Sequence, residues 1–439
     1  MLRLVYTALL YLLAPLALAA TALRGLRDPL YRDRLSERLG FTRVVPPSAP
    51  IWIHAVSVGE VQAAAALVRG LRKRYPQHAV LITTATPTGA QRVRALFGES
   101  VQHAYLPYDV PGAVRRFLNA LEPTIAIIME REIWPNLFRE CEQRGIPVVL
   151  ASARLSEQSA RRHRRLAGLF QPALASNVAI AAQTPADAER FRAIGAPGDR
   201  VHVTGNIKFD LEIDEAVRAA GEALRTSQFP GRLVWVAGST HEKEEDIVLD
   251  AHERVRATHP DALLILVPRH PNRFDQVHTW LKSRGVRFAA RSAGEPVTAG
   301  TSVLLADTLG ELLMFYAACD IAFVGGSLVP IGGHNLLEPA ALARPILIGP
   351  HNFNGADIAQ MLLENGAAIE VRSAQRLSKA IIDLAANPPQ RADMGARGRE
   401  IVATNRGALE RVLEIIEEVT GDQGLVTGQR RSTHCSVGH

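Results

Sequence analysis

The chain has 439 residues, 47% of them hydrophobic and 21% charged, which is the balance of an ordinary globular protein and enough length for two or three domains. Its net charge is +6, and arginines gather within residues 24–38 and 154–165, where they suit lipid or nucleic-acid phosphates or form ordinary solvated helix faces. Three distant cysteines exclude a disulfide framework, and the lack of zinc-ligand spacing and of RNA-binding aromatic motifs argues against a nucleic-acid partner.

The chain opens on an apolar segment, from Leu4 to Leu23, that carries no charge. A segment of this length can cross about 30 Å of hydrocarbon. Residues 17–19 resemble a signal-peptidase site, but the arginines that follow disfavour translocation. We therefore expect an uncleaved anchor with its basic flank over residues 1–30 and the rest of the chain in the cytoplasm. Pro15 and several alanines leave open whether the segment spans the bilayer or lies in one leaflet.

Residues 31–212 form the first predicted domain. Short apolar runs alternate there with stretches such as 61–74 and 113–121, whose apolar residues recur every three or four positions. This alternation is typical of parallel strands wrapped by helices. The predicted strands are 51–58, 79–85, 101–107, 124–129, 147–151, 178–183 and 201–204.

A more polar stretch over 210–229 ends in Phe229-Pro230-Gly231 and is predicted to be a linker. A second alternating series follows, so residues 213–421 are assigned to a second domain that ends in long helices. Residues 422–439 are predicted to be a disordered tail. The predicted strands of the second series are 233–237, 262–267, 286–290, 302–306, 321–324, 345–349 and 368–371.

Two such series predict an α/β fold with two doubly wound, Rossmann-like domains. In sheets of this kind, ligands bind beyond the carboxyl ends of the strands. The polar residues of interest follow strand ends in both halves of the chain, so we expect a site in a cleft between the two domains.

Three charged residues follow strands of the first domain. Glu60 opens the helix after the first strand, where the helix dipole stabilises a carboxylate and weakens it as a base. Glu130 follows the fourth strand. A charge this close to the edge of a sheet is expected to have either an ion-pair partner or a function. Lys208 lies near the end of the domain, as a cation for a phosphate or a developing anion, or as an ordinary surface lysine.

Loops of the second domain also suit a phosphate. The loop around Ser239 joins the first strand of this domain to a helix; it is either a well-capped helix start or a phosphate cradle. Arg269 stands between prolines at 268 and 271, which present a phosphate clamp rigidly. The segment Asp307-Thr308-Leu309-Gly310-Glu311 ends another strand and offers its glycine as a backbone contact.

The glycine-rich run from Gly325 to Asn354 is the clearest ligand signal in the sequence. Two glycine pairs follow a strand, then Asn335 and Glu338 open a short apolar helix before the next strand. The glycines let a ligand approach the backbone, and Glu338 is placed to accept hydrogen bonds from a diol such as a ribose. Glycines alone would be an ordinary turn; with Asn335 and Glu338 they favour a sugar-nucleotide site.

Seven segments in order resemble those of the Kdo transferase family: HAVSVGE, E-x-E-x-WPN, TGNIKFD, AGSTHE, PRHP, D-T-x-GEL and GGSL…GGHN-x-LEPAA. They cover nearly the whole chain, to about residue 420. Members of this family move 3-deoxy-D-manno-oct-2-ulosonic acid (Kdo) from CMP-Kdo to a lipid A precursor in lipopolysaccharide synthesis.

The resemblance implies a GT-B fold and an inverting glycosyltransferase that needs no metal or other cofactor, at the cytoplasmic face of the inner membrane. It implies Glu60 as the catalytic base, with Glu130 and Lys208 stabilising the transition state. The positions that match CMP-binding segments are Ser239, Pro268, Arg269, Leu309, Gly310, Glu311, Asn335, Leu336, Leu337 and Glu338.

Three positions depart from the family pattern: Arg131, Lys243 and Leu336 stand where a small polar residue, a glycine and a proline are expected. Only Arg131 is expected to alter contacts with acceptor phosphates. Two other functions fit the anchor and the fold: a transferase that uses a UDP-sugar on another lipid, and a non-catalytic nucleotide-sugar-binding protein. The second would have no need of Glu60, Glu130 and Lys208 together.

Overall fold

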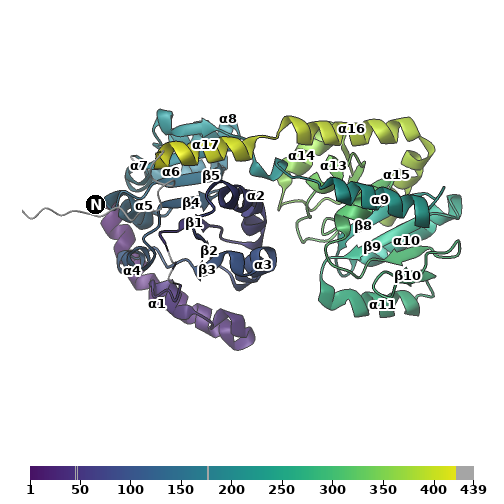
Figure 1. Ribbon diagram of the computed structural model, residues 1–439, viewed down its shortest axis with the longest axis horizontal. Coiled ribbons are helices and arrows are strands. Elements are labelled where there is room, and N and C mark those ends of the chain that lie inside the picture. The colour runs from purple at the N-terminus through teal and green to yellow at the C-terminus, as the bar shows by residue number, and fades with distance from the viewer. Residues whose placement is uncertain (45, 47, 176, 422–439) are drawn as a thin grey trace, which may run out of the picture. The chain divides into compact units, whose positions relative to one another are not determined.

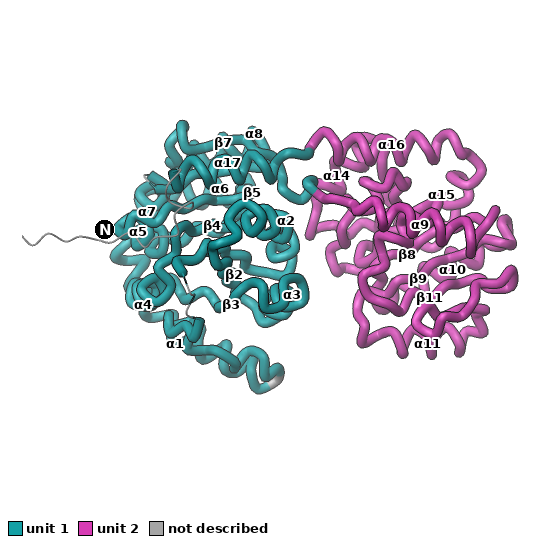
Figure 2. Tube along the Cα trace, viewed as in Figure 1, with its two compact units in different colours: residues 1–210, 406–439 teal, residues 211–405 magenta. Residues whose placement is uncertain are grey.

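The computed structural model describes residues 1–44, 46, 48–175 and 177–421. The chain forms two compact units (Figures 1 and 2): unit 1 holds Met1–Asp210 and the chain from Arg406 onward, and unit 2 holds Leu211–Asn405. The predicted tail over 422–439 lies outside the described residues. Each of the fourteen predicted strands is present at its place in the sequence, seven in each of two sheets.

The sheet of unit 1 is parallel, with the order β3-β2-β1-β4-β5-β6-β7. Its strands are β1 Ile51–His54, β2 Val80–Thr84, β3 Gln102–Tyr105, β4 Ile125–Met129, β5 Val148–Ala153, β6 Val178–Ala182 and β7 Val201–Val203. Its longer helices are α1 Leu2–Arg27, α2 Val58–Arg74, α3 Pro87–Phe97, α4 Pro111–Leu121, α5 Pro135–Gln143, α6 Glu157–Arg165, α7 Ala167–Leu174, α8 Pro185–Ala193 and α17 Ala408–Thr420.

Apolar strands explain this architecture. Both faces of a strand such as β4 are buried, because its side chains alternate between two cores, one beneath α2, α3 and α17 and one beneath α4, α5 and α8. Ile127 belongs to the first core, and Ile128 to the second.

Unit 2 repeats the plan with a parallel sheet of order β10-β11-β9-β8-β12-β13-β14. Its strands are β8 Val234–Thr240, β9 Leu263–Pro268, β10 Phe288–Ala290, β11 Val303–Leu305, β12 Ile321–Val324, β13 Ile346–Ile348 and β14 Ala368–Glu370. Its helices are α9 Glu215–Gln228, α10 Glu244–Thr258, α11 Phe274–Ser283, α12 Leu312–Ala318, α13 Leu337–Ala341, α14 Ala356–Glu364, α15 Ala374–Ala386 and α16 Pro388–Thr404.

The predicted linker over 210–229 is wrong, because most of it is the helix α9. Asp214 caps this helix by accepting a hydrogen bond from the amide of Ala216. Gly221 is buried against Ala317 of α12, so closely that a Cβ at 221 would lie 2.4 Å from the Ala317 side chain. The packing face of α9 consists of Val217, Gly221 and Leu224, while its alanines and most of its polar residues are exposed to solvent.

The last helix also differs from the prediction of one domain over 213–421, because α17 belongs to unit 1. Val412 and Ile416 are buried in the core with α2. The carboxylate of Asp210 accepts hydrogen bonds from the amides of Gly407 and Leu409, both at 2.6 Å, and so holds the returning chain at the start of α17. The apolar face of an amphipathic helix does not say which of two cores it will cover.

Candidate active site

Glu60 lies in the first turn of α2, directly after β1, and only 8% of it is exposed. One of its carboxylate oxygens accepts a hydrogen bond from the amide of Val56 at 2.8 Å. Burial raises the pKa of Glu60 to about 7; the Val56 hydrogen bond opposes this rise, and the carboxylates of Glu130 and Glu132 add to it. This carboxyl group can therefore take up a proton near neutral pH, which the helix-dipole argument alone would not predict.

Glu130 follows β4 and is held from both sides. Its backbone lies in the left-handed region, with φ of 57°, and its side chain is buried. Lys208 Nζ donates to one carboxylate oxygen at 3.1 Å, and Arg154 Nε donates to the other at 2.8 Å. Burial alone would raise the pKa of Glu130, but the two cations and their hydrogen bonds outweigh it and lower the pKa, so the group is ionised at neutral pH.

The two glutamates meet because their strands are neighbours. β1 and β4 pair in parallel, with His54 opposite Ile128, and the strand order of the sheet reverses between them. This reversal is the point at which doubly wound sheets bind their ligands. One carboxyl group with a raised pKa and one with a lowered pKa at such an edge form the usual arrangement of a proton acceptor beside a fixed charge.

In unit 2, the predicted ligand residues leave four adjacent strands, in the order β11-β9-β8-β12. Ser239 lies at the end of β8 with φ of 58°, and Pro268 ends β9. Arg269 follows, and its amide donates to the carbonyl of Thr240 at 3.0 Å, which ties the β8 and β9 loops together. Because the strands are parallel, these loops share one edge of the sheet.

The segment after β11 presents one apolar and one charged residue. Leu309 is 72% exposed, and Gly310 has φ of 84° with open space where a side chain would be. The carboxylate of Glu311 accepts two hydrogen bonds from Arg291, at 2.7 and 3.2 Å, and one from the hydroxyl of Thr308. The hydrogen bond from Arg291 is the main cause that lowers the pKa of Glu311.

Asn335 and Glu338 are already paired with each other. The side-chain oxygen of Asn335 caps α13 by accepting from the amide of Leu337 at 3.1 Å, and its NH2 group donates to Glu338 at 3.0 Å. The side chains of Leu336 and Leu337 are buried, at 4% and 1% exposed. Of these predicted nucleotide contacts, only Asn335 and Glu338 present side chains; the two leucines present backbone.

Glu244, which the sequence analysis did not single out, joins two of these loops. It is fully buried, and its carboxylate accepts hydrogen bonds from the amides of His241 at 3.3 Å, Gly326 at 2.7 Å, Ser327 at 3.1 Å and Leu328 at 2.9 Å. The carboxylate thus fixes the glycine loop after β12 to the loop after β8. The acids at 242 and 244–246 are the available signal, but the sequence gives no way to tell the buried Glu244 and Glu245 from the exposed acids on either side.

Three histidines also gather at this edge. Nε2 of His241 lies 2.8 Å from Nε2 of His334, and their rings are parallel; His270 contacts His241 edge-on, with ring centroids 5.4 Å apart. Burial lowers the pKa of His241 to about 4 and of His334 to about 3, and nearby Arg269 adds to both shifts. The rings are therefore neutral at pH 7. The cations beside them are Arg269 and Arg273, and Arg273 is paired with Glu245.

The comparisons with known proteins now identify the family. Residues 33–211 match the family model of 3-deoxy-D-manno-octulosonic-acid transferase (kdotransferase). A 3-deoxy-D-manno-octulosonic acid transferase of Haemophilus influenzae is 43% identical over 94% of this chain and 98% of its own length, and one of Bordetella pertussis is 40% identical over 88% and 90%. The chain belongs to the Kdo transferase family. It is a glycosyltransferase of lipopolysaccharide biosynthesis.

The GT-B fold predicted for this transferase is also confirmed. The solved structure of MurG from Acinetobacter baumannii covers 85% of this chain and 100% of its own, with a TM-score of 0.54 at 14% identity, a likeness of fold alone. The two seven-stranded parallel sheets carry the same conclusion.

Several arginines of the two predicted phosphate patches of the transferase have partners inside unit 1. Arg34 donates to Glu37 at 2.8 Å and contacts His103, and Arg38 lies over the ring of Tyr105, 4.3 Å from its centroid. In the second patch, Arg154 holds Glu130 and Arg161 pairs with Glu157. Solvated or structural arginines, the simpler of the two explanations, account for these side chains.

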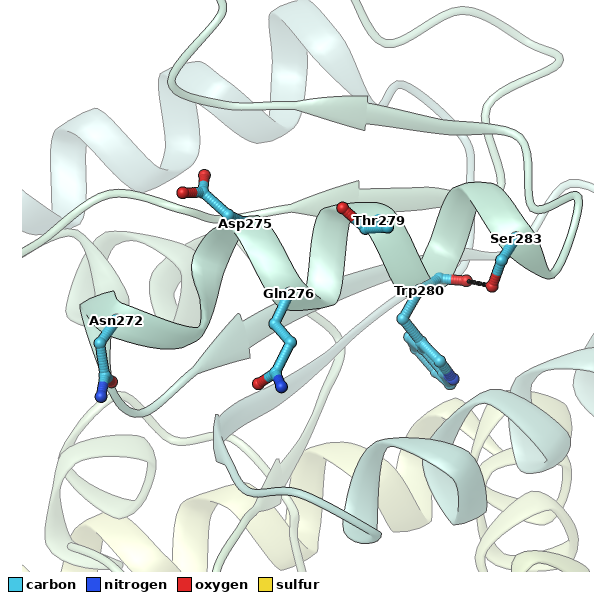
Figure 3. A pocket seen from close by; sticks show the side chains of 6 residues that line it. All are labelled: Asn272, Asp275, Gln276, Thr279, Trp280 and Ser283. Carbon is cyan, nitrogen blue, oxygen red and sulfur yellow. Dashed lines mark hydrogen bonds between the residues drawn. The ribbon is translucent and has the colours of Figure 1, made fainter.

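A shallow hollow of unit 2 lies along α11 (Figure 3) and is lined by Asn272, Asp275, Gln276, Thr279, Trp280 and Ser283. All but Asn272 come from one helix, and no cation converges there, so it lacks the groups that a nucleotide phosphate needs. Among the described residues, no group of three or more His, Cys, Asp or Glu side chains is arranged to hold a metal ion.

Proposed function

We propose that this transferase moves Kdo from CMP-Kdo to a hydroxyl group of a lipid A precursor, with inversion, and that Glu60 is the general base. The observation that carries the proposal is the pair at the β1–β4 edge: a buried Glu60 whose pKa is raised to about 7, beside a Glu130 kept ionised by Lys208 and Arg154.

The reaction would form one bond and break another at the anomeric carbon. The acceptor hydroxyl gives its proton to Glu60 as its oxygen attacks the anomeric carbon. The bond from that carbon to the CMP phosphate breaks, and CMP leaves with the electron pair. Positive charge builds on the sugar during this exchange, and a carboxylate already ionised and fixed, such as that of Glu130, stabilises such charge without having to reorganise. Lys208 and Arg154 would act by holding that carboxylate in place.

We place the donor at the carboxyl edge of unit 2. Arg269 offers a guanidinium to the phosphate, neutral His241 and His334 add hydrogen-bonding nitrogens, and the glycine loop after β12 offers backbone amides. The carboxylate of Glu338 suits the ribose hydroxyls, and exposed Leu309 suits the face of a base. Ser239, Pro268, Gly310, Glu311, Asn335, Leu336 and Leu337 complete the proposed CMP-binding set.

We place the transferase at the cytoplasmic face of the inner membrane. The support is α1: its stretch Leu2–Leu26 is apolar enough, and long enough, to cross a membrane, and it stands near the N-terminus. A signal sequence or a core helix can pass the same test, but none of the apolar window of α1 is buried. An acceptor with acyl chains is reached most readily by an enzyme held at the bilayer.

The decisive experiment replaces Glu60 by Gln and follows the transfer of radiolabelled Kdo to lipid, with the exposed Glu99→Gln as the matched loss of one charge. Loss of a general base lowers the rate by about 10²–10⁴-fold. CMP and UDP are then compared as ligands that raise the thermal midpoint. Retention of more than half the activity would refute the base, and stabilisation by UDP and not by CMP would refute the donor.

A further inference from the structure

The N-terminal helix α1 has two different faces. Its partly buried residues recur every three or four positions along its whole length, as expected for one stripe of a helix: Arg3, Tyr6, Thr7, Leu10, Ala14, Leu18, Thr21 and Ala22. The opposite face exposes large apolar side chains, each at least 44% exposed: Leu2, Leu4, Val5, Leu9, Leu12, Leu13, Leu16, Leu23 and Leu26. Figure 1 shows α1 running along the rest of unit 1. The partly buried stripe is the side that packs there, and the large apolar side chains are exposed.

Polar side chains hold the stripe in place near both ends. The hydroxyl of Tyr6 donates to the buried carboxylate of Asp109 at 2.9 Å, and that of Thr7 donates to Asn136 at 3.2 Å. Further along, the hydroxyls of Thr21 and Tyr108 lie 3.4 Å apart. Tyr6 and Thr21 are separated by about 22 Å at 1.5 Å per residue, so the helix lies alongside the protein over at least that length.

A helix docked in this way cannot also run straight across a bilayer. To span, α1 would have to leave its contacts and carry the hydroxyls of Tyr6, Thr7 and Thr21 into hydrocarbon. It would also leave Asp109, which is 2% exposed, without one of its hydrogen-bond donors. A helix with one stripe docked on the protein and one exposed apolar face instead suits the plane of one leaflet.

A basic hollow of about 340 Å³ lies at the N-terminal end of this helix. Its cations are Arg3 from α1, Arg115 from α4 and Arg139 from α5. Arg115 is paired with Glu140 at 3.1 Å. Within the described parts of the chain, neither Arg3 nor Arg139 has a carboxylate partner. Three guanidinium groups against one carboxylate leave the hollow with an excess of positive charge.

We propose that this hollow binds the phosphate of an anionic phospholipid, in the same leaflet in which α1 lies flat. Leu4, which is 69% exposed, lines the hollow, so the cations stand directly beside the apolar face of α1. This arrangement matches a phospholipid, whose phosphate lies at the membrane surface and whose hydrocarbon chains lie below it. Planar guanidinium groups match a phosphate in geometry as well as in charge. The proposal rests on the membrane location proposed above.

The same docking determines which edge of the sheet faces the membrane. Asp109 and Tyr108 lie in the loop after β3, and Asn136 lies six residues after Glu130, in the first turn of α5 after β4. All three therefore stand near the carboxyl edge of the unit 1 sheet, where Glu60 and Glu130 lie. A leaflet beneath α1 would bring that edge close to the headgroup region, where the hydroxyl of a lipid acceptor is found.

The test uses the full chain with Arg3→Gln and Arg139→Gln combined, and phosphatidylcholine vesicles with and without phosphatidylglycerol. The matched control removes two exposed arginines of unit 2, Arg376→Gln with Arg399→Gln. Each arginine near the surface strengthens binding to anionic vesicles by about fivefold. The ratio of binding to anionic over neutral vesicles should therefore fall roughly 30-fold in the double variant and about twofold or less in the control. Transfer to an acceptor dispersed in detergent should be unchanged in both.

Two results would overturn the hollow as a phospholipid site. One is an equal loss in variant and control, which would mean general charge attraction. The other is unchanged vesicle binding by the double variant. Together with a raised KM for the dispersed acceptor it would assign the hollow to the acceptor, and together with lost binding of inorganic phosphate it would assign the hollow to free phosphate. Loss of transfer with vesicle preference intact would count against the proposed function and not against the hollow.

The flat orientation is tested separately by an environment-sensitive fluorophore on a cysteine placed at position 4, 12 or 23, in a chain with Cys435→Ser; Cys141 and Cys319 are buried. These three positions are all exposed on α1, at 69%, 69% and 63%. A helix in the plane gives equal, shallow quenching by depth-placed lipid quenchers at all three. Deep quenching at 12 with shallow quenching at 4 and 23 would show a spanning helix and refute the flat one.

Discussion

Replacing Glu60 by Gln should remove transfer and, at alkaline pH, make the protein more stable. The carboxyl group has its pKa raised from 4.5 to about 7 in the folded chain. A rise of that size corresponds to about 3 kcal/mol between the two protonation states. Because the folded pKa is the higher one, the contribution of Glu60 to stability is complete below its ordinary pKa. It is lost as the pH rises through about 7.

The amide of Gln keeps the acceptor for the Val56 hydrogen bond but carries no charge at any pH. Relative to the unmodified chain, the Gln variant should therefore gain about 2–3 kcal/mol more at pH 8 than at pH 5. For a unit of this size, that is a difference of roughly 5–10 °C in thermal midpoint. The transfer rate of the unmodified chain should rise with pH through about 7, because only the ionised carboxylate can accept the acceptor's proton.

The assay is calorimetric unfolding at the two pH values for the unmodified chain, Glu60→Gln and the exposed Glu99→Gln. The reasoning fails if Glu60→Gln shifts the midpoint by the same amount at both pH values, since Glu60 would then titrate like an ordinary surface acid. It also fails if Glu99→Gln reproduces the pH-dependent gain, which would trace the effect to overall charge.

Three further outcomes follow from the site. Glu130→Gln should do the opposite of Glu60→Gln. The lowered pKa of Glu130 stabilises the fold above the ordinary carboxyl pKa, so the variant should lose about 3 kcal/mol at pH 8 and progressively less as the pH falls through the folded pKa, as denaturant titrations at pH 8 and at acidic pH would show. Arg269→Ala and Glu338→Ala should each raise the KM for the donor several-fold and leave the KM for the acceptor unchanged, because a charged hydrogen bond is worth about 1.5–3 kcal/mol. Steady-state kinetics with each substrate varied in turn would contradict this if the KM for the acceptor changed instead. Glu244→Gln should destabilise unit 2 by about 3 kcal/mol and weaken CMP binding, because an amide cannot accept from four backbone donors; an unchanged unfolding midpoint would refute this.

The sequence was sufficient for the sheets because their signal is local. Buried parallel strands are short apolar runs, and all fourteen were placed correctly. The same rule, that chemistry follows strand ends, located Glu60, Glu130 and Ser239. It could not give the pKa of Glu60, because that depends on burial and on Glu130, a residue seventy positions away. Nor could it pair Glu130 with Arg154, although both follow strands.

The packing partners of amphipathic helices were harder to predict than the strands. The periodicity of α9 and α17 predicts a packing face but not the core that this face covers. The sequence therefore predicts a linker where α9 forms, and a place in the second domain for α17, which packs on unit 1. The contact that fixes α17 to unit 1 is made by Asp210, whose carboxylate accepts hydrogen bonds from two amides almost two hundred residues away. Such a contact is specified by the folded backbone, and a single acid near a domain end does not stand out in a sequence.

The N-terminal helix shows the same limit with a larger consequence. Its hydropathy predicts an anchor but leaves open whether the helix spans the bilayer. Three hydroxyls decide how it packs, because Tyr6, Thr7 and Thr21 lie on one stripe and each meets a polar partner on unit 1. In the sequence they are only minor interruptions of an apolar run. In the fold they turn the helix so that its most apolar face is outward. We propose that this face lies in the membrane and orients the carboxyl edge bearing Glu60 toward the lipid.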